Sequence, residues 1–281
     1  MTKAIASVAA MQLVEQGKLK LEDPVPNIDP ALGSPQVLEG FDAAGAPKLR
    51  PAKRPITLRH LLTHTAGFSY EIWDANTVRY VKASGMPSTA TGKIASIRMP
   101  LAFDPGDKWE YGVNIDWVGR LVESISGQPL DVYFREKIFA PLGMKDSTAT
   151  SPRRAARAPG HRAPATGRRL SRAASRSETP VHPRVLVRRA ARSTRRPGTI
   201  STFLADAAER GSGNGARILR PETVALMGKN HIGDIRRAGV MKTRPASGRT
   251  TSISFPGPRS AGGWATCSTC SRGRTAEAPA R

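Results

Sequence analysis

The stretch that decides the fold is Met1-Thr2-Lys3-Ala4-Ile5-Ala6-Ser7-Val8-Ala9-Ala10-Met11. Residues 3–16 are apolar nearly all round, and Gly17 follows where a left-handed helix cap is common. A helix of this kind belongs in the centre of a large domain, packed on several sides. Lys3 is costly in the first turn of such a helix unless it serves a polar site; otherwise it lies at a solvated helix start.

The positive charge of the chain is regional. The net charge is +22, yet residues 1–150 hold 17 basic and 16 acidic residues. Residues 151–197 hold 14 Arg, no Lys and a single acid, Glu178. Residues 198–281 hold 13 basic and five acidic residues. A nearly neutral globular segment is therefore followed by arginine-rich sequence of a different character.

This change of composition predicts four segments. Residues 1–150 form a region of several helices with little strand signal. Residues 151–197, of which 34 of 47 are Arg, Ala, Pro or Ser, cannot offset their ordering entropy by burial, and we expect them to be disordered. Residues 198–246 are a partial return of the folded domain, and residues 247–281 are a disordered tail.

Local signals place the helices within these segments. Thr57 is a predicted N-cap of a short apolar helix, and Asn114 is a predicted cap of a helix over residues 115–126. Pro129 suits the first position of the next helix. A further short helix is predicted over residues 221–227, with a proline near its start.

Three stretches, in order along the chain, resemble one family. They are Met1-Thr2-Lys3, the segment Leu61-Leu62-Thr63-His64-Thr65-Ala66-Gly67-Phe68, and the pair Phe103-Asp104-Pro105-Gly106 and Trp109-Glu110-Tyr111-Gly112. They are similar to the Ser-x-x-Lys, Leu-Leu-x-His-Thr-Ser-Gly-Leu and Pro-Gly-x-x-x-x-Tyr-Ser motifs of β-lactamase-related serine hydrolases. That family includes class C β-lactamases, DD-peptidases and β-lactamase-like esterases. The resemblance covers residues 1–150 well and residues 200–245 weakly.

The resemblance implies an α+β fold of the β-lactamase/transpeptidase type. We expect the part present here to be mainly helical, with much of the sheet missing. The implied activity is cleavage of a small-molecule ester or amide through an acyl-serine intermediate, without a metal or an organic cofactor. The catalytic residues that the resemblance carries over are Lys3, beside the serine hydroxyl on one helix face, and Tyr111, which shuttles a proton.

The chain departs from the family motifs in three places. The motif serine would fall one position before Met1, so we expect a truncated and inactive chain. The third position of the family's Tyr-x-Asn is Val113, with Asn114 one residue late, which favours the esterase branch. The Lys-Thr-Gly strand is absent: Lys242-Thr243-Arg244 lies in no predicted strand, and Lys242 is predicted to be a surface lysine.

The arginine-rich segments have two interpretations. Arg without Lys, together with Ala, Pro, Ser, Thr and Gly, is typical of a GC-rich gene translated out of frame, and we expect such a frameshift over residues 151–197 and about 247–281. The alternative is a basic nucleic-acid-associating protein with a helical domain, since 14 arginines would bind phosphate and weak nonspecific polyanion binding would follow. Reading the gene in the other two frames separates these hypotheses.

The remaining candidate residues are mostly predicted to have no catalytic role. His64 is predicted to hold its turn rather than act as a base, and Ser69 and Ser126 lack a nucleophile-elbow context. Cys267 and Cys270 lack the further ligands of a zinc site and are interpreted as a chance pair. An N-terminal Thr2 nucleophile stays open as a minor alternative. No export signal or membrane span is recognised, and the compartment stays open with the cytoplasm preferred.

Overall fold

The computed structural model describes residues 2–32, 34–145, 147, 212–213, 216–235, 241–243 and 251–253. Two earlier predictions concern residues outside these ranges. They are the disorder of residues 151–197 and the interpretation of Cys267 and Cys270 as a chance pair. The helices are α1 (Thr2–Glu15), α2 (Leu58–Leu62), α3 (Ala75–Ser84), α4 (Asn114–Ser126), α5 (Leu130–Phe134) and α8 (Pro221–Met227). Shorter helical turns are η1 (Val25–Asn27), η2 (Pro30–Leu32), η3 (Thr89–Thr91), η4 (Ile94–Ile97) and η5 (Arg135–Phe139), the last a π-helical turn.

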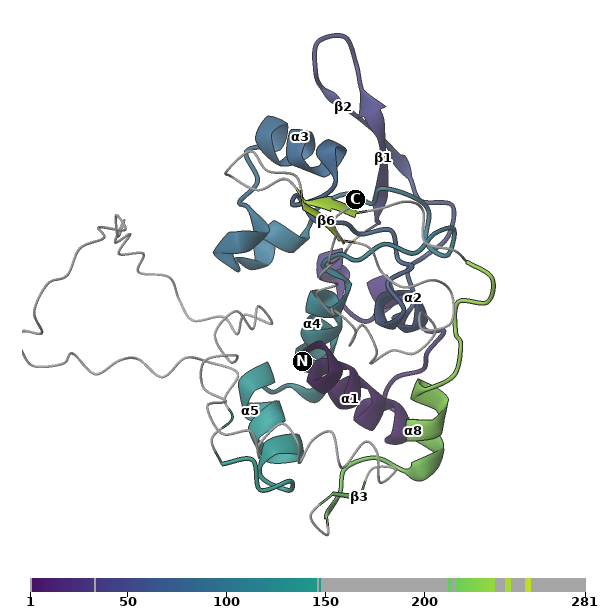
Figure 1. Ribbon diagram of the computed structural model, residues 1–281, viewed down its shortest axis with the longest axis vertical. Helices are drawn as coiled ribbons and strands as arrows, with labels where there is room; N and C mark the ends of the chain where they lie inside the picture. Colours follow the sequence, from purple (N-terminus) through teal and green to yellow (C-terminus); the bar gives the residue numbers. More distant parts are fainter. Residues whose placement is uncertain are drawn as a thin grey trace, which may run out of the picture.

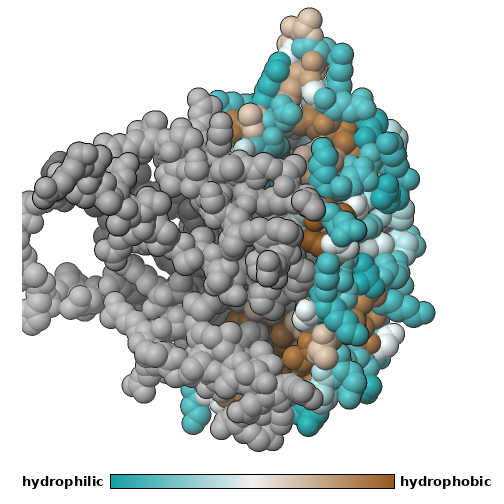
Figure 2. Space-filling view, turned by 45° about the vertical axis from the view of Figure 1, so that its right-hand side comes forward, coloured by the Kyte–Doolittle hydropathy of each residue, from teal (hydrophilic) through white to brown (hydrophobic). Residues whose placement is uncertain are grey.

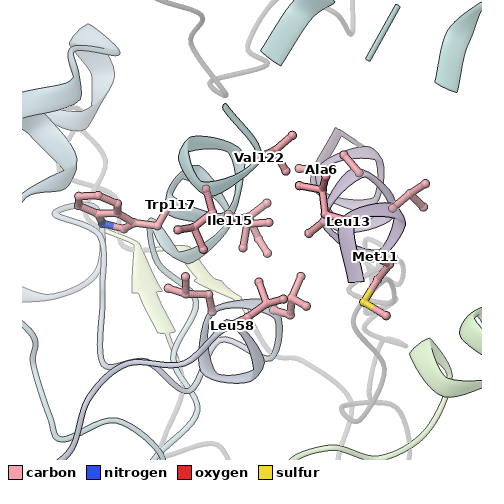
Figure 3. Close-up of a cluster of buried hydrophobic side chains, with 14 of the residues drawn as sticks. Ala6, Met11, Leu13, Leu58, Ile115, Trp117 and Val122 are labelled. Carbon is pink, nitrogen blue, oxygen red and sulfur yellow. The ribbon is translucent and has the colours of Figure 1, made fainter. Parts of the chain in front are cut away.

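Helix α1 lies in the centre of the core, as its apolar sequence predicts. Its side chains face those of α2 and α4 (Figure 3), and Met11 and Leu13 are among the largest fully buried side chains. Each such side chain contributes about 1.5–3 kcal/mol through burial. The helix ends at Glu15, and Gly17 follows with φ +70°, the left-handed conformation expected of it.

Helix α2 begins at the predicted cap. The Thr57 side chain accepts a hydrogen bond from His60 N, and His60 Nδ1 accepts one from Thr57 N, so the two residues form a capping box. Leu58, Leu61 and Leu62 are buried on the inner side of this helix. The turn after α2 carries His64, and this turn later contributes to the candidate site.

Helices α4 and α5 differ slightly from the prediction. Helix α4 begins at Asn114, with Val113 as its N-cap, and ends at Gly127 in a left-handed cap with φ +68°. Pro129 precedes the first helical residue of α5 rather than occupying that position. Helix α4 packs against both α1 and α2, which makes it the second central element of the core.

The strands form three two-stranded antiparallel pairs among the described residues. Strands β1 (Gln36–Phe41) and β2 (Pro47–Pro51) form a hairpin that projects from one end of the molecule (Figure 1). The sequence analysis did not predict this hairpin. Its register shifts between Leu38 and Gly40, and its adjacent residues Val37 and Leu38 are both buried, so the alternation of buried and exposed residues that identifies a strand is missing.

The remaining strands lie in the later part of the chain. Strand β3 (Ser212–Gly213) pairs with β4 (Ala216–Arg217), and β5 (Met241–Thr243) pairs with β6 (Thr251–Ile253). Strand β6 falls within residues 247–281, for which the sequence predicts a disordered tail. The predicted helix over 221–227 is α8, with Pro221 in its first turn.

The later segment is bonded to the first half of the chain. Gln12 Nε2 donates to Ile218 O and to Lys137 O, each at 3.1 Å, and Glu15 Oε1 accepts from Arg220 N at 2.7 Å. Figure 1 shows α8 beside the end of α1 to which these residues belong. The residues on both sides of the undescribed stretch therefore share one core.

The visible surface of the described residues is mainly hydrophilic. Figure 2 shows hydrophobic residues in smaller areas between polar ones on this face. The large hydrophobic residues that stay exposed are Leu49, Ile72 and Ile94. No helix in the described part of the chain is both long and apolar enough to span a membrane.

Candidate active site

The two predicted catalytic residues lie together in the structure. Lys3, in the first turn of α1, has its Nζ atom 4.8 Å from the centroid of the Tyr111 ring. This separation is within the range of a cation–π interaction. These residues are 108 positions apart in the sequence, and the packing of α1 against α4 brings them together, because Tyr111 lies just before α4 begins at Asn114.

The backbone around Tyr111 is held from two directions. Trp73 Nε1 donates to Tyr111 O at 3.1 Å, and Glu110 N donates to His64 O at 2.9 Å. Gly112 packs so closely on the preceding segment that an added Cβ would lie 2.2 Å from Phe68 O. Only glycine fits at this position, and the close packing fixes the exit of the Tyr111 loop into α4.

Aromatic rings surround the Tyr111 side chain. The ring centroids of Tyr70 and Trp73 lie 5.7 Å and 5.6 Å from that of Tyr111, and 5.3 Å from each other. Such separations are typical of favourable aromatic contacts. Tyr70 and Trp73 were not identified from the sequence; their one signal was two aromatic residues within five positions after the stretch 61–68.

A carboxylate lies behind these rings. The Tyr70 hydroxyl donates to Asp116 Oδ2 at 3.3 Å. Burial raises the pKa of Asp116, and the nearby positive charge of Lys3 acts in the opposite direction. Burial and the Asp116 charge both raise the pKa of Tyr70, so this phenol stays protonated. The sequence analysis missed Asp116, which looks like an ordinary acidic residue in the first turn of a helix.

His64 occupies the other side of the Tyr111 ring system. Its imidazole centroid lies 4.8 Å from that of Tyr111 and 6.2 Å from that of Trp109. Burial lowers the pKa of His64 to about 3, and the positive charge of Lys3 adds to this shift. The ring is therefore neutral at neutral pH, which supports the interpretation of His64 as a structural residue.

Asn114 does not cap α4, contrary to the prediction. It is fully buried, and its Nδ2 atom lies 3.0 Å from His64 Nδ1. The amide therefore serves a tertiary partner, and α4 begins without a side-chain cap. A capping rule considers only the neighbouring backbone, whereas this side chain is turned inward to the imidazole.

Comparison with known proteins assigns the family. The β-lactamase family model matches residues 1–267. The chain belongs to this family. The acyltransferase mokF of Monascus pilosus is 44% identical over 149 residues, which are 52% of this chain and 36% of that protein. Lovastatin esterase of Penicillium rubens is 38% identical over 148 residues, 52% of this chain and 37% of that protein.

Solved structures agree with this assignment. Unliganded simvastatin synthase from Aspergillus terreus matches with a TM-score of 0.60 and 32% identity, covering 80% of this chain and 55% of that one. The chain thus has the β-lactamase/transpeptidase-like fold, and its homologues include acyltransferases and esterases. It spans about a third of the length of the curated relatives it matches.

The other serines of this β-lactamase-family chain that we considered have hydrogen-bond partners within the described residues. The Ser69 hydroxyl donates to Glu110 Oε1, and Ser69 is buried. Ser126 Oγ accepts from Gln128 N at 3.2 Å at the end of α4. The Ser126 hydroxyl therefore stabilises a turn, whereas the Ser69 hydroxyl joins two segments that are 41 positions apart.

Lys242 requires a correction. It lies in strand β5, where the sequence analysis predicted no strand, and β5 pairs with β6 in the register Lys242 to Ser252. The pattern of three consecutive residues was too short to indicate a strand from sequence. Within the described ranges, no group of three or more His, Cys, Asp or Glu residues is arranged to hold a metal ion.

Proposed function

We propose that this chain carries the lysine–tyrosine part of a site for cleavage or transfer of acyl groups from small-molecule esters or amides, with esters preferred. The observation that carries the proposal is the position of Lys3 Nζ over the Tyr111 ring, 4.8 Å from its centroid. A lysine and a tyrosine this close can exchange protons with a hydroxyl placed between them. The names of the relatives, an acyltransferase and an esterase, support the preference for esters.

The reaction needs a serine on the same helix face as Lys3. A residue three positions before Lys3 lies beside the lysine side chain, because residues i and i+3 are neighbours on a helix. Its hydroxyl oxygen would attack the carbonyl carbon while its proton passes to the Lys3–Tyr111 pair. Tyr111 would then give a proton to the departing alkoxide or amine, leaving an acyl-serine. Water or a second alcohol would attack this ester and regenerate the hydroxyl.

The polypeptide of residues 1–281 has no serine in that position, because the position precedes Met1. We propose that this polypeptide alone does not turn over an ester. Ser69 is no replacement, since it is buried and its hydroxyl donates to Glu110. A polypeptide that includes serine directly before Met1 would bring the hydroxyl to Lys3.

The test compares residues 1–281 with a form extended by Met-Ala-Ser before Met1. Both are treated with a fluorophosphonate probe and assayed with a p-nitrophenyl ester. We expect labelling and ester release only in the extended form, on the added serine. Lys3→Met and Tyr111→Phe should each abolish both signals, while Lys18→Met, at an exposed lysine after α1, should leave them unchanged.

Two outcomes would contradict the proposal. One is labelling of residues 1–281 themselves that depends on Lys3 and Tyr111, which would assign the nucleophile elsewhere. The other is a folded extended form, judged by an unchanged circular dichroism spectrum, that reacts with neither reagent.

A further inference from the structure

We infer that Asn114 and His64 are positioning residues for Tyr111: the Asn114 amide fixes the His64 imidazole as its Nε2–H tautomer, and this neutral ring and its backbone hold the phenol in place. The importance of this arrangement for catalysis rests on the function proposed above. The contacts themselves do not, and they can be tested without turnover.

The first step is the bond between the amide and the imidazole. Asn114 is fully buried, and its Nδ2 lies 3.0 Å from His64 Nδ1. In this orientation of the amide its nitrogen donates, so Nδ1 accepts and the ring proton resides on Nε2. A doubly protonated ring would set two donors against each other at this contact.

In the second step, burial and the charges around the His64 imidazole keep this ring neutral. Lys3 faces the same cluster from α1, and its positive charge disfavours a second cation there. Burial acts in the same direction and lowers the pKa of His64 to about 3. The phenols of Tyr70 and Tyr111 and the carboxyl group of Asp116 also belong to this cluster, and the Tyr70 hydroxyl donates to Asp116. Lys3 thus remains the cation beside Tyr111.

The third step is the contact with the phenol ring. The His64 and Tyr111 centroids lie 4.8 Å apart, with the ring planes inclined at 42°. Tyr70 and Trp73 lie at 5.7 Å and 5.6 Å from the same ring. With Lys3 Nζ also 4.8 Å from the Tyr111 centroid, the phenol has neighbours from four side chains. An imidazole that rotated away from this orientation would leave a gap in the packing around the Tyr111 ring.

The fourth step is the backbone of His64. It has φ 60°, the left-handed region that a residue with a Cβ rarely adopts. The surrounding bonds impose this conformation: His64 O accepts from Glu110 N at 2.9 Å, and Thr65 O accepts from Gly106 N at 2.7 Å. His64 therefore holds Tyr111 twice, through its ring and through the residue preceding Tyr111.

These contacts indicate that His64 positions Tyr111 and does not transfer a proton. The Nδ1 lone pair of His64 is occupied by Asn114, and the ring is a weak base in its buried position. His64 therefore acts on the reaction through Tyr111 and takes no proton itself.

The experiment is nitrogen-15 NMR of histidine-labelled protein of residues 1–281, with His64→Gln used to assign the His64 signals. We expect the Nε2–H tautomer for His64 and no titration between pH 4.5 and 8. Asn114→Asp, which places a carboxylate opposite Nδ1, should bring the titration of His64 into this range. The control Asn76→Asp adds the same charge at an exposed position of α3 and should leave the His64 signals unchanged.

A second readout follows Tyr111. Cross-peaks between the ring protons of His64 and Tyr111 should be present in the wild type. They should be lost or strongly reduced in Asn114→Leu, which keeps the branching at Cγ and removes the donor. The Asn76→Asp control should retain them.

Three results would overturn the inference. They are an Nδ1–H tautomer in the wild type, an Asn114→Asp variant whose His64 still does not titrate, and His64–Tyr111 cross-peaks that persist in Asn114→Leu. If the Asn114 variants do not fold, the tautomer observed for His64 in the wild type decides whether the inference holds. Since no turnover is measured, a failed ester assay with the expected spectra would refute the catalytic proposal and leave the positioning intact.

Discussion

Arg50 holds both carboxylate oxygens of Asp104, with Nη1 at 2.9 Å from Oδ1 and Nη2 at 2.7 Å from Oδ2. This bidentate pair joins strand β2 of the hairpin to the loop that leads to Tyr111. Asp104 Oδ1 also accepts from Lys53 N at 2.9 Å. The hairpin that sequence reasoning missed therefore anchors one of the motifs that sequence reasoning identified.

The ion pair predicts a loss of stability in acid. The Arg50 guanidinium and the Lys53 backbone hold the pKa of Asp104 well below its ordinary value of 3.8. The folded state thus favours the charged carboxylate, so this contribution is present above pH 3.8 and is lost as the pH falls below it. Asp104→Asn should reduce stability at pH 7 and flatten its fall below pH 4, measured by urea unfolding across this range.

Asp107 provides the matched control for this prediction. It pairs with Arg54 at 3.0 Å, but both side chains are exposed. Exposed ion pairs contribute only about 0–1 kcal/mol. Asp107→Asn should therefore change the unfolding free energy little, and a loss equal to that of Asp104→Asn would argue against the bidentate pair as the cause.

His64 predicts a second pH dependence in a higher range. Its folded pKa of about 3 lies below the ordinary value of 6.5, so the unfolded chain binds the extra proton between these values. Stability should therefore fall as the pH falls from 6.5 towards 3, by at most roughly 5 kcal/mol from this residue. Burial lowers the pKa of His60 as well and adds in the same direction.

His64→Gln isolates this contribution. Stability measured by urea unfolding at steps between pH 7 and 4 should have a shallower slope in the variant than in the wild type, because the contribution of His64 is removed while that of His60 remains. Equal slopes would contradict a buried neutral imidazole at this position.

Gly112 predicts a severe steric effect. An alanine Cβ would lie 2.2 Å from Phe68 O, and backbone cannot move aside as a flexible side chain can. Gly112→Ala should destabilise the protein by roughly 3 kcal/mol or more in thermal or urea unfolding. Gly228→Ala is the control: its φ is −84° and the nearest atom would lie at 3.6 Å, so stability should stay within about 1 kcal/mol.

Asp116 predicts a difference between two substitutions. Asp116→Asn keeps an oxygen that can accept from the Tyr70 hydroxyl, whereas Asp116→Ala leaves this buried donor without its acceptor. The alanine variant should therefore be less stable than the asparagine variant by about 1–3 kcal/mol. Equal stabilities in urea unfolding would mean that the Tyr70 bond contributes nothing measurable.

The helical core was predictable because its signals are local. The all-round apolar sequence of α1, the Thr57 cap and the proline at the start of α8 each act within a few residues. The β1–β2 hairpin was not predictable in the same way. Its adjacent residues Val37 and Leu38 are both buried, which removes the two-residue period of a strand.

The candidate site also contains residues that could be predicted from the sequence and residues that could not. Lys3 and Tyr111 were found through motifs that resemble a family, and the structure places them in contact range. Tyr70 and Asp116 depend on how the segment after Phe68 folds back over α4, which no short pattern encodes. Asn114 shows the limit most clearly, since a good capping residue is turned into the core by an imidazole 50 positions earlier.

The hydrogen bonds of Gln12 help to hold two separate parts of the chain together. The bond of Gln12 to Ile218 O and that of Arg220 N to Glu15 Oε1 link residues 1–145 to residues 216–235 by noncovalent contacts, beside the core that the two ranges share. A single proteolytic nick between these two ranges should therefore leave a pair of fragments that co-elute in size-exclusion chromatography. Separately produced halves should likewise reassemble by fragment complementation.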